Sequence, residues 1–102
     1  NYVAERSGLQ VVVAEVPFPI ASPEQLIAAV LSKVSARTRL ALIDHVVSQT
    51  GLVFPIAQLV AELAQRGVKT LVDGAHAPGM LPLNLTQLGA TYYSGNCHKW
   101  LC

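Results

Sequence analysis

Apolar and polar residues follow two different periods along the chain, and these periods alternate. Short runs rich in β-branched residues, each bounded by glycine, proline or turn residues, predict four strands, at residues 9–16, 40–46, 68–73 and 90–95. Between the first three runs, apolar residues recur at helical spacing, and a short turn or helix is expected before the fourth. Strands that alternate with helices predict an α/β fold with a mostly parallel sheet covered on both faces.

Both helical stretches carry recognisable end signals. Ser22 is suited to the N-cap of the first, with Pro23 at its first helical position and Glu24 in its first turn. Pro55 opens the second, and Gly67 is a favourable stop after its last turn. The helices therefore fit the connections between successive strands.

In a parallel sheet, functional side chains gather beyond the carboxyl ends of the strands. That rule selects three stretches, 44–51, 73–79 and 94–100. We interpret Asp44 and His45 as structural, because strand alternation points at least one of them away from the cleft.

Two of these stretches contain an acid and an amine. Asp73 ends a predicted strand and begins DGAHAPG, although an ordinary Asp-Gly turn has the same sequence. Lys99 follows the next strand and lies between His98 and Trp100. Tight, apolar surroundings of this kind would favour the neutral, nucleophilic amine. Neighbouring parallel strands would present both groups at one edge of the sheet.

Composition narrows the classes of function. The 102 residues are 52% hydrophobic and 13% charged, so such a chain is expected to expose apolar surface unless something covers it. A net charge of +1 without a basic stripe argues against a nucleic-acid surface, and no apolar run has the length of a membrane span. The two cysteines, Cys97 and Cys102, are expected to be reduced thiols of a cytoplasmic protein.

An acid and an amine at one sheet edge suit pyridoxal phosphate, which needs a lysine for its Schiff base and an acidic partner for its ring nitrogen. The stretch VDGAHAPGMLPLNLTQLGATYYSGNCHKW resembles the core of the class V aminotransferases, which are fold-type I pyridoxal-phosphate enzymes. DGAHAPG and GNCHKWL resemble the branch of isopenicillin N epimerase more than that of the cysteine desulfurases.

The resemblance implies a three-layer αβα domain and a larger protein. Residues 1–102 would be the central part of the cofactor-binding large domain, with flanking segments at both ends. The chain begins NYVAERSG, which looks like the last turn of a helix. The strand at 9–16 would lie at a sheet edge, separated from 40–46 by a strand encoded earlier. The whole protein would be a homodimer whose substrate is an amino acid, a small molecule.

The resemblance also implies roles for individual residues. Lys99 matches the Schiff-base lysine, and it is the natural general base at the α-carbon once substrate displaces it. Asp73 matches the partner of the pyridinium nitrogen. His76 falls where many relatives carry a glutamine that hydrogen-bonds the 3′-oxygen of the ring.

Three further positions match less directly. His98 corresponds to the histidine beside the lysine that reaches the phosphate. Asn96 stands where many relatives have a serine or threonine as a phosphate ligand, and its amide still donates to a phosphate oxygen. Ser48 falls where relatives place a small polar residue near the 3′-oxygen.

The reaction itself stays open at this point. Epimerisation, transamination, C–S cleavage and desulfuration all begin at the α-carbon, so a cysteine desulfurase or C–S lyase is the alternative to an epimerase or aminotransferase. A zinc site is a remote alternative, built from plausible ligands that lack CxxC or HxxxH spacing and leave Lys99 unexplained: Asp73, His76, Cys97, His98 and Cys102. A nucleotide-binding module is disfavoured, because no GxGxxG or Walker pattern occurs.

Overall fold

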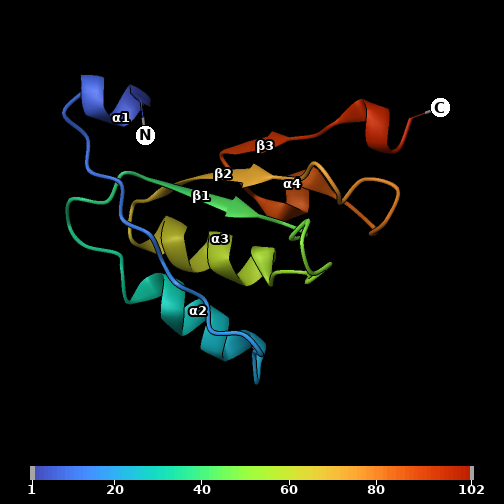
Figure 1. Cartoon of the computed structure of the whole chain (residues 1–102), viewed down its shortest axis with the longest axis horizontal. Coiled ribbons are helices and arrows are strands. Elements are labelled where there is room, and N and C mark those ends of the chain that lie inside the picture. Colours follow the sequence, from blue (N-terminus) through green and yellow to red (C-terminus); the bar gives the residue numbers. More distant parts are fainter. Residues whose placement is uncertain (1, 102) are drawn as a thin grey trace. The chain divides into compact units, whose positions relative to one another are not determined.

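The computed structural model describes residues 2–101, and the chain divides into two compact units, one ending at Ser35 and one beginning at Ala36. The second unit contains all of the strands found among the described residues: β1 (Leu40–Asp44), β2 (Lys69–Asp73) and β3 (Tyr92–Ser94). They form a parallel sheet in the order β1-β2-β3 (Figure 1). The strands predicted at 40–46, 68–73 and 90–95 are therefore confirmed, the first two slightly shorter than expected and the third half as long.

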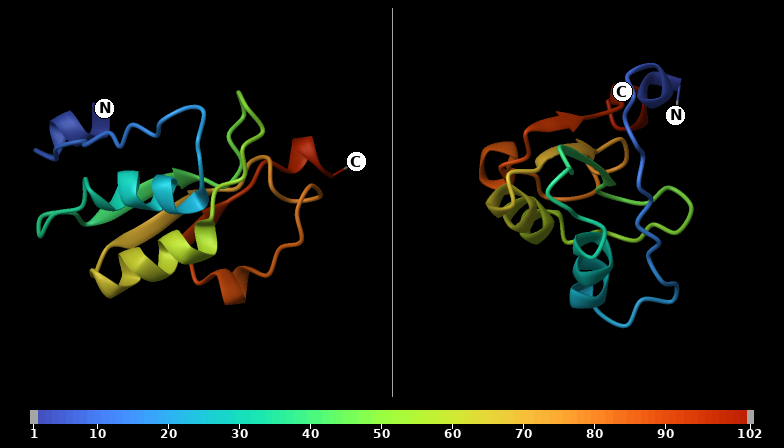
Figure 2. Two further views of the ribbon diagram at one scale, coloured as in Figure 1. Left: turned by 90° about the horizontal axis from the view of Figure 1, so that it is seen from below. Right: turned by 90° about the vertical axis from the view of Figure 1, so that its left-hand side faces the viewer.

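Two helices connect these strands. Helix α3 (Ile56–Gln65) links β1 to β2, and the short helix α4 (Leu85–Leu88) links β2 to β3. Figure 2 shows α3 running along one face of the sheet. A 3-10 turn, η1 (Cys97–Lys99), follows β3.

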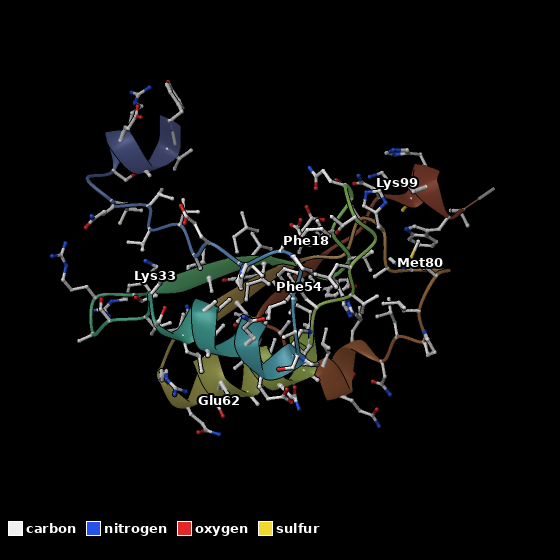
Figure 3. The ribbon with its side chains drawn as sticks, turned by 60° about the horizontal axis from the view of Figure 1, so that its bottom comes forward. Phe18, Lys33, Phe54, Glu62, Met80 and Lys99 are labelled. Atoms are coloured by element: carbon white, nitrogen blue, oxygen red, sulfur yellow. The ribbon has the colours of Figure 1, made fainter. Side chains whose placement is uncertain are left out.

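Helix α3 and the sheet make the core of this unit, because the apolar stripe of the helix meets the inward-facing residues of the strands. The buried members of this core include Ile43, Ile56, Leu59, Val60, Leu63 and Val72. Glu62 points away from the sheet (Figure 3) and pairs with Arg66 at 2.6 Å on the solvent side of the helix. The period of 3.6 residues read from the sequence thus separates the two faces of α3 correctly.

The other face of the sheet stays open in the part of the chain that the structure describes. Leu42 is 69% exposed and Tyr92 54% exposed. The predicted coverage of both faces is therefore not achieved by these residues, since no helix of the second unit reaches that side.

Two hydrogen bonds to threonine side chains join β2 to the residue that precedes β3. The amide of Thr70 donates to Oγ1 of Thr91 at 3.1 Å, and the amide of Thr91 donates to Oγ1 of Thr70 at 3.2 Å. Thr70 is 2% exposed, so both of its polar groups need these partners. This reciprocal pair fixes the register that aligns the opposite, carboxyl ends of the strands.

The first unit contains α1 (Tyr2–Arg6) and α2 (Pro23–Leu31). The Oγ of Ser22 accepts a hydrogen bond from the Gln25 amide at 3.4 Å, which confirms the predicted N-cap. Helix α1 matches the helical turn expected at the start of the chain.

The strand predicted at 9–16 is wrong for this structure, where the segment has no regular structure and pairs with no strand (Figure 1). Val12 is 57% exposed and Val13 70% exposed. A β-branched run becomes a strand only when a second strand satisfies its backbone donors and acceptors, and among residues 2–101 none does so. Among residues 2–101, no helix is long and apolar enough to cross a membrane.

Candidate active site at the carboxyl edge of the sheet

Asp73 is held at the end of the central strand by hydrogen bonds to its backbone and its side chain. The peptide that joins Asp73 to Gly74 is bonded on both sides: its carbonyl accepts from the His45 amide at 2.8 Å, and its N–H donates to the Ser94 carbonyl at 2.9 Å. The Oδ1 atom of Asp73 accepts from the Ala75 amide at 2.9 Å and from the Ser94 hydroxyl at 3.5 Å. This carboxylate is therefore fixed by the sheet itself.

Lys99 lies beyond the end of β3, on the turn η1 (Figure 3). Its amide donates to the Asn96 carbonyl at 3.0 Å, which closes the turn. Its Nζ atom lies 2.9 Å from Nε2 of His76, so an ammonium at Lys99 donates to an unprotonated ring nitrogen. His76 belongs to the DGAHAPG segment three residues after Asp73. The structure thus brings Lys99 to the segment that carries Asp73, as the strand order predicted.

The apolar enclosure predicted around Lys99 is wrong for the described residues. Lys99 is exposed, and Trp100 next to it is 40% exposed. The Trp100 side chain comes close to Gly79, where a Cβ would lie 3.2 Å from the Trp100 Cβ, and Met80, the next residue, is 61% exposed. The turn η1 projects past the end of the sheet, where residues 76–79 approach it.

Three of the predicted cofactor-binding residues are not joined to this group. Ser48 is exposed in the loop after β1, Asn96 is exposed at the start of η1, and His98 is exposed within η1. Within residues 2–101 their side chains make no hydrogen bond to Asp73, His76 or Lys99. Their predicted roles toward phosphate and the 3′-oxygen stay predictions.

Two residues of β3 that the sequence patterns did not single out, Tyr93 and Ser94, also belong to this edge. Nδ1 of His45 lies 2.8 Å from the Tyr93 hydroxyl, and the two rings meet edge to face with centroids 5.9 Å apart. Burial lowers the pKa of His45, which is 7% exposed. Burial and then the charge of Asp73 raise the pKa of Tyr93. Both residues are therefore neutral near pH 7.

The sequence did contain a signal for both residues. Ser94 is the register partner of Asp73, and Tyr93 is the partner of Val72. Pairing the ends of the predicted strands at 68–73 and 90–95 would have set Asp73 opposite Gly95, one residue away from its observed partner Ser94.

The site is an edge cluster rather than an enclosed pocket. An open hollow of about 320 Å³ lies beside the first turn of α3 and α4, lined by residues that include His45, Phe54 and Leu88, but not by Asp73, His76 or Lys99. Among the described residues, no three His, Cys, Asp or Glu side chains gather as metal ligands would. Cys102, one of the thiols considered for zinc, lies outside the described residues.

Comparison with known proteins identifies the family. The sequence model of the aminotransferase class-V family matches residues 2–102. The chain belongs to the class V aminotransferase family. It is 44% identical over 99 residues to isopenicillin N epimerase of Streptomyces clavuligerus, covering 97% of this chain and 25% of that protein. It is 38% identical over 107 residues to a putative L-cysteine desulfhydrase of Oryza sativa subsp. japonica, covering 97% of this chain and 22% of that protein.

The fold of a class V enzyme is confirmed by a solved structure. A cysteine desulfurase of Escherichia coli superposes with a TM-score of 0.83 at 22% identity, covering 96% of this chain and 24% of that one. The chain thus spans about a quarter of the length of these relatives. The predicted family, fold-type I architecture and pyridoxal-phosphate dependence of the family are confirmed.

Proposed function

We propose that these residues form the central part of the cofactor-binding large domain of a pyridoxal-phosphate enzyme that acts at the α-carbon of an amino acid. The observation that carries the proposal is the 2.9 Å contact of Lys99 with His76, on the segment that begins with the hydrogen-bonded Asp73. An amine and a carboxylate at the ends of neighbouring parallel strands suit the two groups that this cofactor requires.

The donor set fits the cofactor. When bound, pyridoxal phosphate supplies an electron sink for the bond broken at the α-carbon. Lys99 is proposed to hold its aldehyde as a Schiff base, and exposure leaves that amine accessible to it. Asp73 is proposed to keep the ring nitrogen protonated, because its carboxylate is already fixed by the Ala75 amide.

Other residues of the edge have proposed supporting roles. His76 is proposed to hydrogen-bond the 3′-oxygen of the ring in place of Lys99. Its Nε2 already lies at hydrogen-bond distance from the amine of Lys99. Ser48 is proposed near the same oxygen, and His98 and Asn96 at the phosphate. The freed amine of Lys99 would be the base that removes or returns the α-proton.

We favour epimerisation as the reaction, on the 44% identity to isopenicillin N epimerase. Cysteine C–S cleavage is the second candidate, favoured by the 38% identity to a putative L-cysteine desulfhydrase. Loss of α-deuterium from a labelled amino acid without sulfide release supports the first, and sulfide release from cysteine supports the second. A homodimer, from the family resemblance, and a cytoplasmic location, from the sparse cysteines, complete the proposal.

The test uses the whole enzyme that contains this chain, with each lysine exchanged in turn. Lys99→Ala is expected to remove the visible absorption band of the bound cofactor and to lower kcat by a factor on the order of 10³ or more, because both the covalent anchor and the base are lost. Lys69→Ala is the matched control, since Lys69 is an exposed lysine at the opposite end of β2. Near-normal turnover by Lys99→Ala would refute the assignment.

A further inference from the structure

Three register partners, Ile43, Val72 and Tyr93, lie next to one another on the face of the sheet that α3 covers, close to the edge that carries Asp73. Ile43 pairs with Val72 and Val72 with Tyr93, so these three side chains share the face that α3 covers. His45 lies two residues after Ile43, and Gly74 lies two residues after Val72. Because successive residues of a strand alternate between faces, both return to the α3 face. Asp73 lies between Val72 and Gly74, so its side chain projects from the opposite face.

His45, Gly74 and Tyr93 form what we call the His45–Tyr93 clamp. The Tyr93 hydroxyl reaches Nδ1 of His45 at 2.8 Å, with the rings at 86° to each other. This hydrogen bond joins the ends of β1 and β3, the two outer strands, across the central strand β2 (Figure 1). The Tyr93 ring passes so close to the central chain that a Cβ built on Gly74 would overlap its ring and its hydroxyl.

The clamp contacts the same peptide that positions the Asp73 carboxylate. The Asp73–Gly74 peptide is hydrogen-bonded in the sheet plane by the His45 amide and the Ser94 carbonyl. Tyr93 supports it from the α3 face, while the carboxylate on the other face accepts from the Ala75 amide. A shift of the Tyr93 ring would therefore tilt this peptide and change the direction of the carboxylate.

We propose that His45, Gly74 and Tyr93 are positioning residues that hold the Asp73 carboxylate in its direction toward the ring nitrogen of the cofactor. This inference rests on the proposed function, because it assumes the role assigned there to Asp73. The clamp acts through Asp73 and touches neither cofactor nor substrate.

The electrostatics of the clamp agree with this geometry. Burial lowers the pKa of His45 and raises that of Tyr93, so the hydrogen bond joins two neutral groups near pH 7. The charge of Asp73 further raises the Tyr93 pKa, so the two residues interact although they lie on opposite faces of the sheet. A neutral clamp supports the carboxylate without competing for it as an ion pair.

The test compares the two adjacent tyrosines of β3 in the whole enzyme. Tyr93→Phe removes the hydroxyl and keeps the ring, whereas Tyr92→Phe makes the same change on the exposed face of the same strand. The loss of one buried hydrogen bond is expected to lower kcat about tenfold in Tyr93→Phe, with little change in KM for the amino acid. The pH titration of the cofactor's visible band should shift in Tyr93→Phe and not in Tyr92→Phe.

Two variants of His45 test whether the hydrogen bond to Tyr93 matters for kcat and for the titration of the cofactor band. His45→Asn keeps a polar group near the position of Nδ1 and is expected to recover most of kcat and the wild-type titration. His45→Leu keeps an apolar filling but no partner for Tyr93, and should resemble Tyr93→Phe.

The outcomes separate this inference from the function on which it rests. If the wild-type enzyme lacks a cofactor band that requires Lys99, the proposed function fails. If that band is present but Tyr93→Phe matches Tyr92→Phe in kcat and titration, the clamp proposal is overturned. It is equally overturned if Tyr93→Phe loses only thermal stability, with kcat and titration unchanged.

Discussion

Two histidines at the same sheet edge form similar contacts in opposite environments. His76 lies 2.9 Å from the exposed amine of Lys99, whereas the buried His45 lies 2.8 Å from the hydroxyl of Tyr93. The first pair joins two segments beyond the sheet, and the second joins two strands across it. The difference indicates that Lys99, the group proposed to react, is placed where ligands reach it, while the support of Asp73 is built on the protected face.

The comparison also explains why Asp73 is central to the site. It is the last residue of β2, with Gly74 and the clamp on one face and the segment leading to His76 after it. The sheet hydrogen bonds at this position hold the Asp73–Gly74 peptide that the clamp contacts. A change at Asp73 should therefore affect catalysis, and a change at Gly74 should lower stability and, by moving the Tyr93 ring, also affect catalysis through Asp73.

The largest effect is expected from removal of the charge at the strand end. Asp73→Asn should retain part of the cofactor but lower kcat by roughly 10²–10³-fold, the range found when a preorganised electrostatic partner is removed. Asp44→Asn is the matched control, because Asp44 is the register partner of Asp73 at the end of β1. Steady-state kinetics give kcat for both variants. An Asp73→Asn enzyme with unchanged kcat would show that this carboxylate only supports the turn.

A smaller effect is expected when the space used by the clamp is filled. Gly74→Ala forces the Tyr93 ring away and should destabilise the protein by about 1–3 kcal/mol, as overpacking of a core does. Gly95→Ala is the control, since its added methyl would meet Trp100 at an ordinary contact distance of 4.0 Å. Denaturant unfolding gives both values, and equal stabilities would show that the Tyr93 ring relaxes freely.

The smallest effect concerns pH. Burial lowers the pKa of His45 in the folded protein, so between that value and the unfolded pKa of about 6.5 the unfolded chain binds more protons. The free energy of unfolding should therefore fall as the pH drops below about 6.5. The groups that face His45 here are the Tyr93 hydroxyl and, through it, Asp73. Unfolding curves at several pH values should show a weaker fall in the free energy of unfolding for His45→Asn than for the wild type. An identical fall would show that His45 is not the cause of the pH dependence.

Local patterns predicted the parts of the fold whose partners lie nearby in the chain. The strands at β1 and β2 and the helix α3 between them carry their own periodicity, and their packing satisfies one another. The run at 9–16 has an equally strong pattern, but no neighbouring strand among the described residues pairs with it. Apolar periodicity therefore predicts a tendency to form a strand, and pairing decides whether the strand forms.

The site was predictable as far as motifs and strand order determine it. The motifs gave Asp73 and Lys99, and strand order placed them at one edge. The exposure of Lys99 was not predictable from its neighbours in sequence, because what covers a turn depends on distant segments. The role of Gly74 was hidden for the same reason, since its lack of a side chain matters only because Tyr93 crosses it.

The central claim is that Lys99 carries the cofactor, and chemical trapping tests it most directly. The whole enzyme is reduced with borohydride after loading with pyridoxal phosphate, digested, and mapped by mass spectrometry. We predict a single phosphopyridoxyl label within SGNCHKWLC, on Lys99, with Lys33 and Lys69 unlabelled. A label on another lysine, or no label in an enzyme that turns over its amino acid, would contradict the account.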